Sequence, residues 1–289
     1  MRKVWLITTD HLEEELWFRE DEDFKAAMNF IAVLAASMPE VKVLAFILMS
    51  NHVHFVLKGT DSEVESFIHQ FKKRYSMYYQ QKWGVKKFLH LNGVDIREIP
   101  YEDEGVERAI AYVQMNCVAA NICSHPSQYP WGTGNSFFNQ TKPSGTQLKD
   151  LSARARKRVL HSNCDLLPCN WHIGPEGYIV PQEYVDVKAV ESIFRLPKRM
   201  NYFLSTSSKA RKRLEAVDHL PAFRDQIILS AVPDLLRSLF GKESFRELAA
   251  QEQPEFMRQI RFRFSADINQ IARVCGLSYA DAASIIDSV

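Results

Sequence analysis

Short apolar runs and longer helical patterns alternate through the N-terminal part of the chain, in an order that few folds can accommodate. Apolar runs of strand length are expected at Val4–Thr9, Val41–Met49, His52–Leu57 and Val94–Ile99, and helical periodicity at Asp21–Ser37, Asp61–Trp83 and Asp103–Cys123. The order is strand, helix, strand, strand, helix, strand, helix. It predicts an α+β fold, a ferredoxin-like antiparallel sheet covered on one side, with one added helix.

The chain beyond this unit differs in composition. Glycine, asparagine, serine and proline gather between Gly132 and Gly145, as in an exposed connection. We therefore expect a catalytic domain over residues 1–138, a linker over 139–150 and a helical C-terminal domain over 151–289. Basic runs such as Arg154–Arg158 in this second part are typical of solvated helix faces.

The C-terminal end has a more specific pattern. An apolar helix from Ile268 is expected to stop at Gly276, and Ser278 then caps a second helix from Tyr279. Two helices joined at a glycine, within residues 265–287, have the outline of a helix-turn-helix. A plain helical hairpin has the same pattern and stays open as an alternative.

Composition limits the environment of the protein. No apolar run approaches the roughly 18 residues that span a bilayer, so no membrane segment is expected. The five cysteines among 289 residues are an odd and small number, which favours reduced thiols and a cytoplasmic location. A formal net charge of +1 argues against a surface that is basic throughout, although it leaves room for basic patches.

The stretch His52-Val53-His54 lies in one of the expected strands. Side chains two residues apart in a strand point to the same face, so both imidazoles stand together while Val53 points away. Two neutral imidazoles on a rigid strand are a suitable pair of ligands for a divalent cation. The alternative is that both histidines are ordinary polar residues of a half-exposed strand.

A further ligand and a nucleophile are available on the last helix of the domain. Tyr112 and Asn116 are four residues apart and share one helical face. The amide oxygen of Asn116 is a candidate third ligand of the cation, with the Tyr112 hydroxyl beside it as a nucleophile. A phenol has a pKa of about 10, so it needs a neighbouring charge or base to attack phosphorus at neutral pH.

The helix expected over Asp61–Trp83 mixes cations with aromatic rings. Such a mixture suits a single nucleic-acid strand, because rings stack on bases and cations follow the phosphates. The candidate DNA-binding residues are Lys72, Lys73, Arg74 and Lys82. Alternatively, the aromatic residues at helical spacing belong to the core and only the cations are exposed.

Three segments together resemble a known family. Met49–Leu57, Tyr112–Ala120 and Tyr129–Trp131 are similar to the signature series of the HUH-type single-tyrosine transposases, especially the REP-associated tyrosine transposases. The resemblance implies that His52, His54 and Asn116 bind Mg²⁺ or Mn²⁺. It also implies that Tyr112 attacks single-stranded DNA, often beside a hairpin, leaving a 5′-phosphotyrosine and a free 3′-hydroxyl.

The same resemblance raises two structural questions. Members of the family work as monomers or as dimers with exchanged tyrosine helices, so a homodimer is one expected state. The family's helix motif has proline where this chain has Cys117. Without that proline the helix is expected to continue past Asn116, which changes the direction of the amide.

Other functions remain open at this point. One alternative is a DNA-binding protein of the same fold that no longer cuts, for example a repressor. Another is an RNA-binding module, for which Trp5 and Phe55 are the available sheet aromatics. A zinc site built from His161, Cys164, Cys169 and His172 has an unusually short spacing for that metal.

Overall fold

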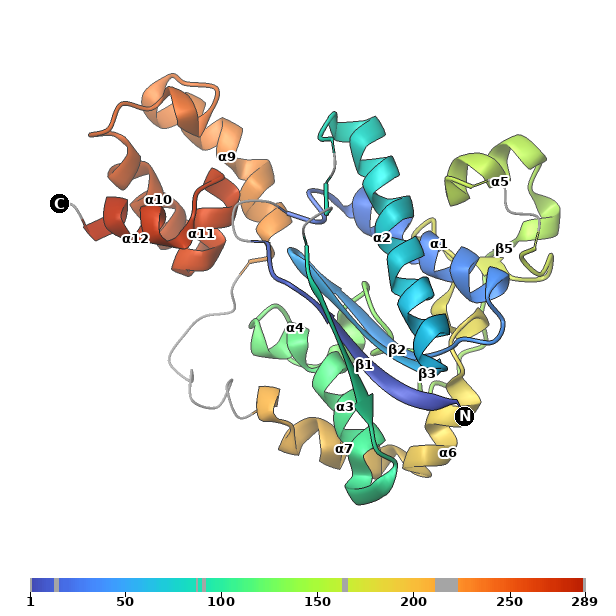
Figure 1. The fold of residues 1–289 in the computed structure, drawn as a ribbon. Coiled ribbons are helices and arrows are strands. Elements are labelled where there is room, and N and C mark those ends of the chain that lie inside the picture. The colour runs from blue at the N-terminus through green and yellow to red at the C-terminus, as the bar shows by residue number, and fades with distance from the viewer. Residues whose placement is uncertain are drawn as a thin grey trace.

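The computed structural model describes residues 2–12, 16–86, 88–89, 92–162, 166–210 and 223–287 (Figure 1). Its centre is a four-stranded sheet in the order β2-β3-β1-β4. All neighbouring strands run antiparallel. The strands are β1 (Lys3–Thr9), β2 (Lys42–Met49), β3 (His52–Gly59) and β4 (Val94–Ile99).

Helices cover both faces of this sheet, not one face as predicted, because the added helix packs opposite the other two (Figure 1). Helices α1 (Asp21–Ser37) and α2 (Asp61–Trp83) pack on one face, and α3 (Gly105–Gln114) lies on the other. The order of strands and helices up to β4 is that of the ferredoxin-like fold, which confirms the predicted fold class. The expected bounds of α1, α2 and β4 agree with the structure because local signals mark them, for example the capping box of Thr60 and Glu63 at the start of α2.

The helix predicted over Asp103–Cys123 is wrong as a single element. Helix α3 ends at Gln114, and after Met115 one more turn follows as α4 (Asn116–Ala119). The side-chain amide of Asn116 donates to the carbonyls of Tyr112 (2.9 Å) and Val113 (3.1 Å). Such a backward bond competes with the backbone ladder and accounts for the break without any proline.

The remaining helices follow the sheet in sequence and are shorter than α1 and α2. They are α5 (Ala153–Leu160), α6 (Val187–Phe194), α7 (Pro197–Thr206), α9 (Asp225–Phe240), α10 (Gln253–Phe264), α11 (Ile268–Cys275) and α12 (Tyr279–Asp287), with two-residue strands β5 (Thr146–Gln147) and β6 (His172–Ile173). The helices predicted on either side of Gly276 are present, with that glycine in the left-handed conformation at φ 67°. None of the helices in the described ranges has the length and apolar character that a membrane crossing requires.

The boundary between the two apolar cores lies later in the sequence than the linker expected at residues 139–150. Side chains from Leu148 to Ala210 belong to the same buried cluster as the sheet, and a second cluster begins at Ile228 within α9–α12. The reason is backbone pairing with β2, where Leu48 donates to the Trp131 carbonyl (2.8 Å) and Asp186 to the Val43 carbonyl (2.8 Å). These bonds cover the edge of β2 and draw the following segments onto the sheet.

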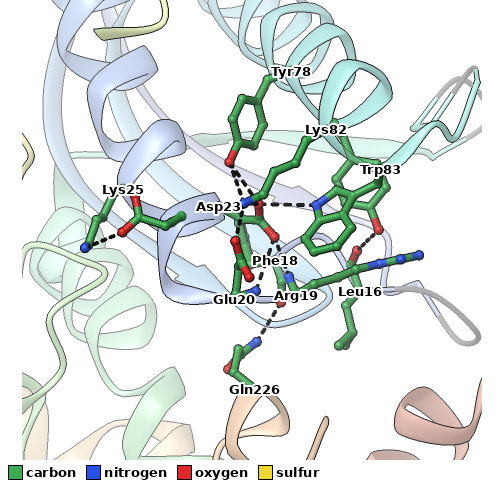
Figure 2. A network of polar contacts seen from close by, with 12 residues as sticks. Leu16, Phe18, Arg19, Glu20, Asp23, Lys25, Tyr78, Lys82, Trp83 and Gln226 are labelled. Carbon is green, nitrogen blue, oxygen red and sulfur yellow. Dashed lines mark hydrogen bonds and ion pairs between the residues drawn. The ribbon is translucent and has the colours of Figure 1, made fainter. Parts of the chain in front are cut away.

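A buried carboxylate joins α1 to α2 (Figure 2). Asp23 is fully buried and accepts hydrogen bonds from Lys82 Nζ (2.7 Å), Tyr78 OH (3.0 Å) and Trp83 Nε1 (3.3 Å). Backbone N–H groups of the segment before α1 bind its other oxygen. Lys82 also pairs with Glu20 at 2.5 Å. The ammonium predicted to contact DNA is therefore used inside the fold, where it neutralises a buried charge.

We expect Lys82→Met to lower the free energy of unfolding by about 1–3 kcal/mol, because Asp23 loses its cation but keeps its other donors. Urea denaturation of the full chain measures this difference. Lys73→Met on the exposed face of the same helix is the matched control, with an expected change within about 0.5 kcal/mol. Equal stability of the two variants would remove the structural role of Lys82.

Candidate active site

Strand pairing brings His52 and His54 to the face of the sheet that α3 covers. Phe55, the next residue of β3, points to the opposite face and packs on Phe67 and Phe71 of α2. The ring centroids of His52 and His54 are 4.8 Å apart with perpendicular planes. Both side chains are buried, with 7% and 1% exposed. The predicted alternation along the strand is confirmed, and the two imidazoles share one enclosed site.

Each histidine is oriented by a polar neighbour. His54 Nδ1 lies 2.9 Å from the hydroxyl of Thr8, which is its partner across the β1–β3 ladder. His52 Nδ1 lies 2.9 Å from the amide oxygen of Asn51, whose amide nitrogen donates to the Leu12 carbonyl. Because the second bond fixes the orientation of Asn51, His52 must donate from Nδ1, and its Nε2 carries the lone pair.

The remaining nitrogen of His54 is the clearest sign of a ligand site. His54 Nε2 is buried and has no hydrogen-bond partner among the described residues. Burial, followed by the charge of Lys209, lowers the pKa of His54 to about 3. Burial also lowers the pKa of His52 well below its usual range, with His54 and His11 adding to the effect. Both rings are therefore neutral near pH 7, which is the form that binds a cation.

Tyr112 belongs to the same site in the same chain. Its ring stands edge-on to the His54 ring, with centroids 5.7 Å apart. Lys209 lies over the Tyr112 ring, with Nζ 4.8 Å from the centroid. Burial raises the pKa of Tyr112, and the guanidinium of Arg97 opposes this shift. The phenol is thus neutral at pH 7.

Asn116 lies in the same pocket as His52 and is 4% exposed. Both hydrogen bonds of its side chain use the amide nitrogen, which donates to the carbonyls of Tyr112 and Val113. The amide oxygen has no hydrogen-bond partner in the described part of the chain. Cys117, which replaces the expected proline, is buried and donates its thiol to the Gln114 carbonyl (3.3 Å).

His11 also belongs to the site, although no partner for it is evident from the sequence. Its ring stacks on the ring of His52 at a centroid distance of 3.7 Å and an interplanar angle of 12°. It also lines the pocket that contains His52 and Asn116. The sequence has no local signal for this contact, because it follows from the antiparallel register, which pairs Thr8 with His54 and directs the end of β1 toward His52.

The candidate DNA-binding cations on α2 lie across the sheet from this site. Aromatic residues of α2 pack against Phe55 of β3, so the opposite face of the helix points away from the sheet. Lys73 is exposed and Arg74 is partly exposed on that outer face. Lys72 donates its ammonium to the carbonyl of Asn92, and burial lowers its pKa. As with Lys82, part of the predicted cationic set is used within the fold.

Two of the alternative sites find little support. His172 uses both ring nitrogens, pairing with Glu183 (2.5 Å) and with Gln147 (3.1 Å), and Cys164 lies outside the described residues. No group of three or more histidine, cysteine, aspartate or glutamate side chains suited to a metal occurs in the described ranges. Phe55 is fully buried under α2, so it offers no open ring for RNA.

Comparison with known proteins adds independent information. The family model described as "Transposase IS200 like" matches residues 17–93, which include both histidines but end before Tyr112. A solved structure of a REP-associated tyrosine transposase bound to a REP hairpin is similar at 14% identity and a TM-score of 0.32, over 46% of this chain and 77% of that one. No curated protein matches. The family match confirms the resemblance over residues 17–93, where the chain is similar to the IS200-like transposases.

Proposed function

We propose that this protein is a transposase that cleaves and transfers single-stranded DNA, with Tyr112 as nucleophile and His52, His54 and Asn116 as ligands of Mg²⁺ or Mn²⁺. The family match over residues 17–93 supports the transposase role. The observation that carries the finer assignment is the buried and unpartnered Nε2 of His54, next to the ring of Tyr112.

The donor set fits such a cation. Two neutral imidazoles, each oriented through Nδ1, leave their Nε2 atoms available, and the oxygen of Asn116 adds a hard ligand. Three protein ligands leave coordination positions for water and a phosphate oxygen. When bound, the cation would polarise the phosphate and stabilise the charge that develops during cleavage.

The reaction assigned to Tyr112 is a transesterification, in which one phosphoester bond forms and one breaks. The Tyr112 oxygen forms a bond to phosphorus and loses its proton, while the bond from phosphorus to the 3′ oxygen breaks and that oxygen leaves as a hydroxyl. A phosphodiester is replaced by a phosphotyrosine ester, so another 3′-hydroxyl can reverse the step on a new strand without ATP. The charge of Arg97 lowers the pKa of the phenol and so favours the phenolate that attacks, and Lys209 places a second cation over the ring.

The DNA partner is a single strand, with a hairpin beside the cleavage position. Lys73 and Arg74 remain candidates for contact with DNA outside the site, because both reach the outer surface of α2. His54 and Tyr112 come from one chain, so each subunit of a homodimer would hold a complete site. A repressor of the same fold is the competing function, and the first experiment separates it from a transposase.

The full chain, incubated with Mn²⁺ and a labelled hairpin-bearing single strand, is expected to form an adduct that survives boiling in detergent. Tyr112→Phe removes the attacking oxygen and should abolish the adduct. Tyr101→Phe is the matched control, because Tyr101 is 54% exposed and should leave the yield unchanged. Tyr129 is no rival, since it is buried and donates to the Leu48 carbonyl (2.7 Å). Bound DNA without any adduct would favour the repressor.

Mn²⁺ binding is expected to depend on the histidine pair. His54→Ala should weaken Mn²⁺ binding by at least about tenfold. Titration calorimetry, or the decrease of the electron paramagnetic resonance signal of free Mn²⁺ on binding, measures this affinity. The comparison is His125→Ala, a solvent-exposed histidine whose loss should leave the affinity unchanged. Equal Mn²⁺ affinities in the two variants would make the pair structural.

Cleavage should accelerate with pH because the Tyr112 phenol is neutral at pH 7 and its pKa is raised by burial. The phenolate fraction then grows up to that raised pKa, and the single-turnover rate should increase about tenfold per pH unit between roughly pH 7 and 9. A rate that stays constant over this range would contradict attack by a phenolate that forms by ionisation of Tyr112 before the chemical step.

A further inference from the structure

A pocket of about 690 Å³ lies between the histidine site and the C-terminal helices. Figure 1 shows the bundle α9–α12 at the end of the sheet, beside α4. One wall of the pocket belongs to the catalytic site and includes His11, His52 and Asn116. The opposite wall includes Asn269 and Arg273 of α11 and Tyr279 of α12. The C-terminal domain thus forms part of the enclosure around the proposed metal site.

The charges on the C-terminal wall largely cancel. Arg273 binds Asp225 through Nε (2.8 Å) and Nη2 (3.3 Å), and its side chain is 15% exposed. Gln270 also donates to Asp225. Asp267, which also lines the pocket, accepts from the backbone of Gln270 as the cap of α11. Such a wall has little excess charge for a phosphate and is better matched to the uncharged parts of a strand.

Two side chains on this wall are available to a ligand. Tyr279 is 50% exposed, and Asn269 is exposed one turn before Arg273 on α11. Neither side chain makes a hydrogen bond or ring contact with another part of the described chain. An open phenol ring stacks on bases of any sequence, and a carboxamide pairs with the donors and acceptors of base edges. The two together suit nucleobases.

The second helix of the pair is poorly suited to read a duplex. Helix α12 has the sequence YADAASIID, which contains acidic residues and no lysine or arginine. A recognition helix in the major groove usually brings cations to the phosphates and long polar side chains to the bases. Its first residue, Tyr279, lines the pocket instead.

We infer that the pocket binds the unpaired bases next to the phosphate that Tyr112 attacks, with Tyr279 stacking on one base and Asn269 hydrogen-bonding to its edge. This inference rests on the proposed function, since the phosphate at the histidines defines where the strand enters. The helix pair at the C-terminus then acts as a wall for a single strand, and not as an independent reader of double-stranded DNA.

Fluorescence anisotropy with a labelled single strand of mixed sequence tests the inference on the full chain. Tyr279→Ala should weaken binding about tenfold through loss of one stacked base, and Asn269→Ala by about threefold through loss of one base contact. Phe262→Ala is the matched control, because this aromatic residue of α10 is 86% exposed and lies outside the pocket. The Phe262→Ala variant should bind the strand with the affinity of the wild type.

Wild-type affinity in both pocket variants would overturn the inference. A loss that is larger for duplex than for single-stranded DNA would also overturn it, since it would make the helices duplex readers. A strand that carries 5-iodouracil should crosslink to Tyr279 under ultraviolet light, and crosslinking only elsewhere contradicts the assignment. Adduct formation at Tyr112 is scored separately. If Tyr279→Ala loses affinity but the wild type forms no adduct, the pocket still binds a single strand and the proposed cleavage by Tyr112 is rejected.

Discussion

The antiparallel pairing of β1 with β3 is the constraint on which the candidate site depends. It sets Thr8 opposite His54 and directs the following chain, with His11, over His52. A shift of the strand register by one residue would turn both histidines to the opposite face of the sheet, into the apolar layer under α2. The register is secured by that layer, because Phe55 fills it from the same strand between the helix side chains Phe67 and Phe71.

Burial gives the site its chemical character and also a cost. A buried nitrogen without a partner, as in His54, is unfavourable by roughly 1–3 kcal/mol, and a bound cation would remove that penalty. The same burial keeps both imidazoles neutral and ready to bind, while it keeps the Tyr112 phenol protonated. Burial therefore favours the proposed role of the imidazoles as ligands and opposes the proposed role of Tyr112 as a nucleophile, so nearby cations are needed to favour the phenolate.

The C-terminal bundle is joined to the sheet domain near α1 by a few polar contacts. Gln226 donates to the Phe18 carbonyl (2.7 Å), and Arg224 pairs with Asp21 (3.3 Å). Phe18 and Asp21 both lie just before Asp23 in the chain, and the buried network of Asp23 holds α1 against α2 (Figure 2). The bundle has its own apolar core, so its wall of the pocket is built independently of the histidine strand. This arrangement allows the two walls to contribute different contacts to one ligand.

Local patterns in the sequence determined the strands, the main helices and the shared face of His52 and His54, because periodicity and caps act over a few residues. The break before Asn116, the stacking of His11 and the pairing of Lys82 with Asp23 were decided only by the tertiary structure. Each depends on hydrogen bonds, rings or charges whose geometry or partners the local pattern does not specify. The same holds for the pocket, in which residues from both ends of the chain meet because two separately formed cores pack side by side.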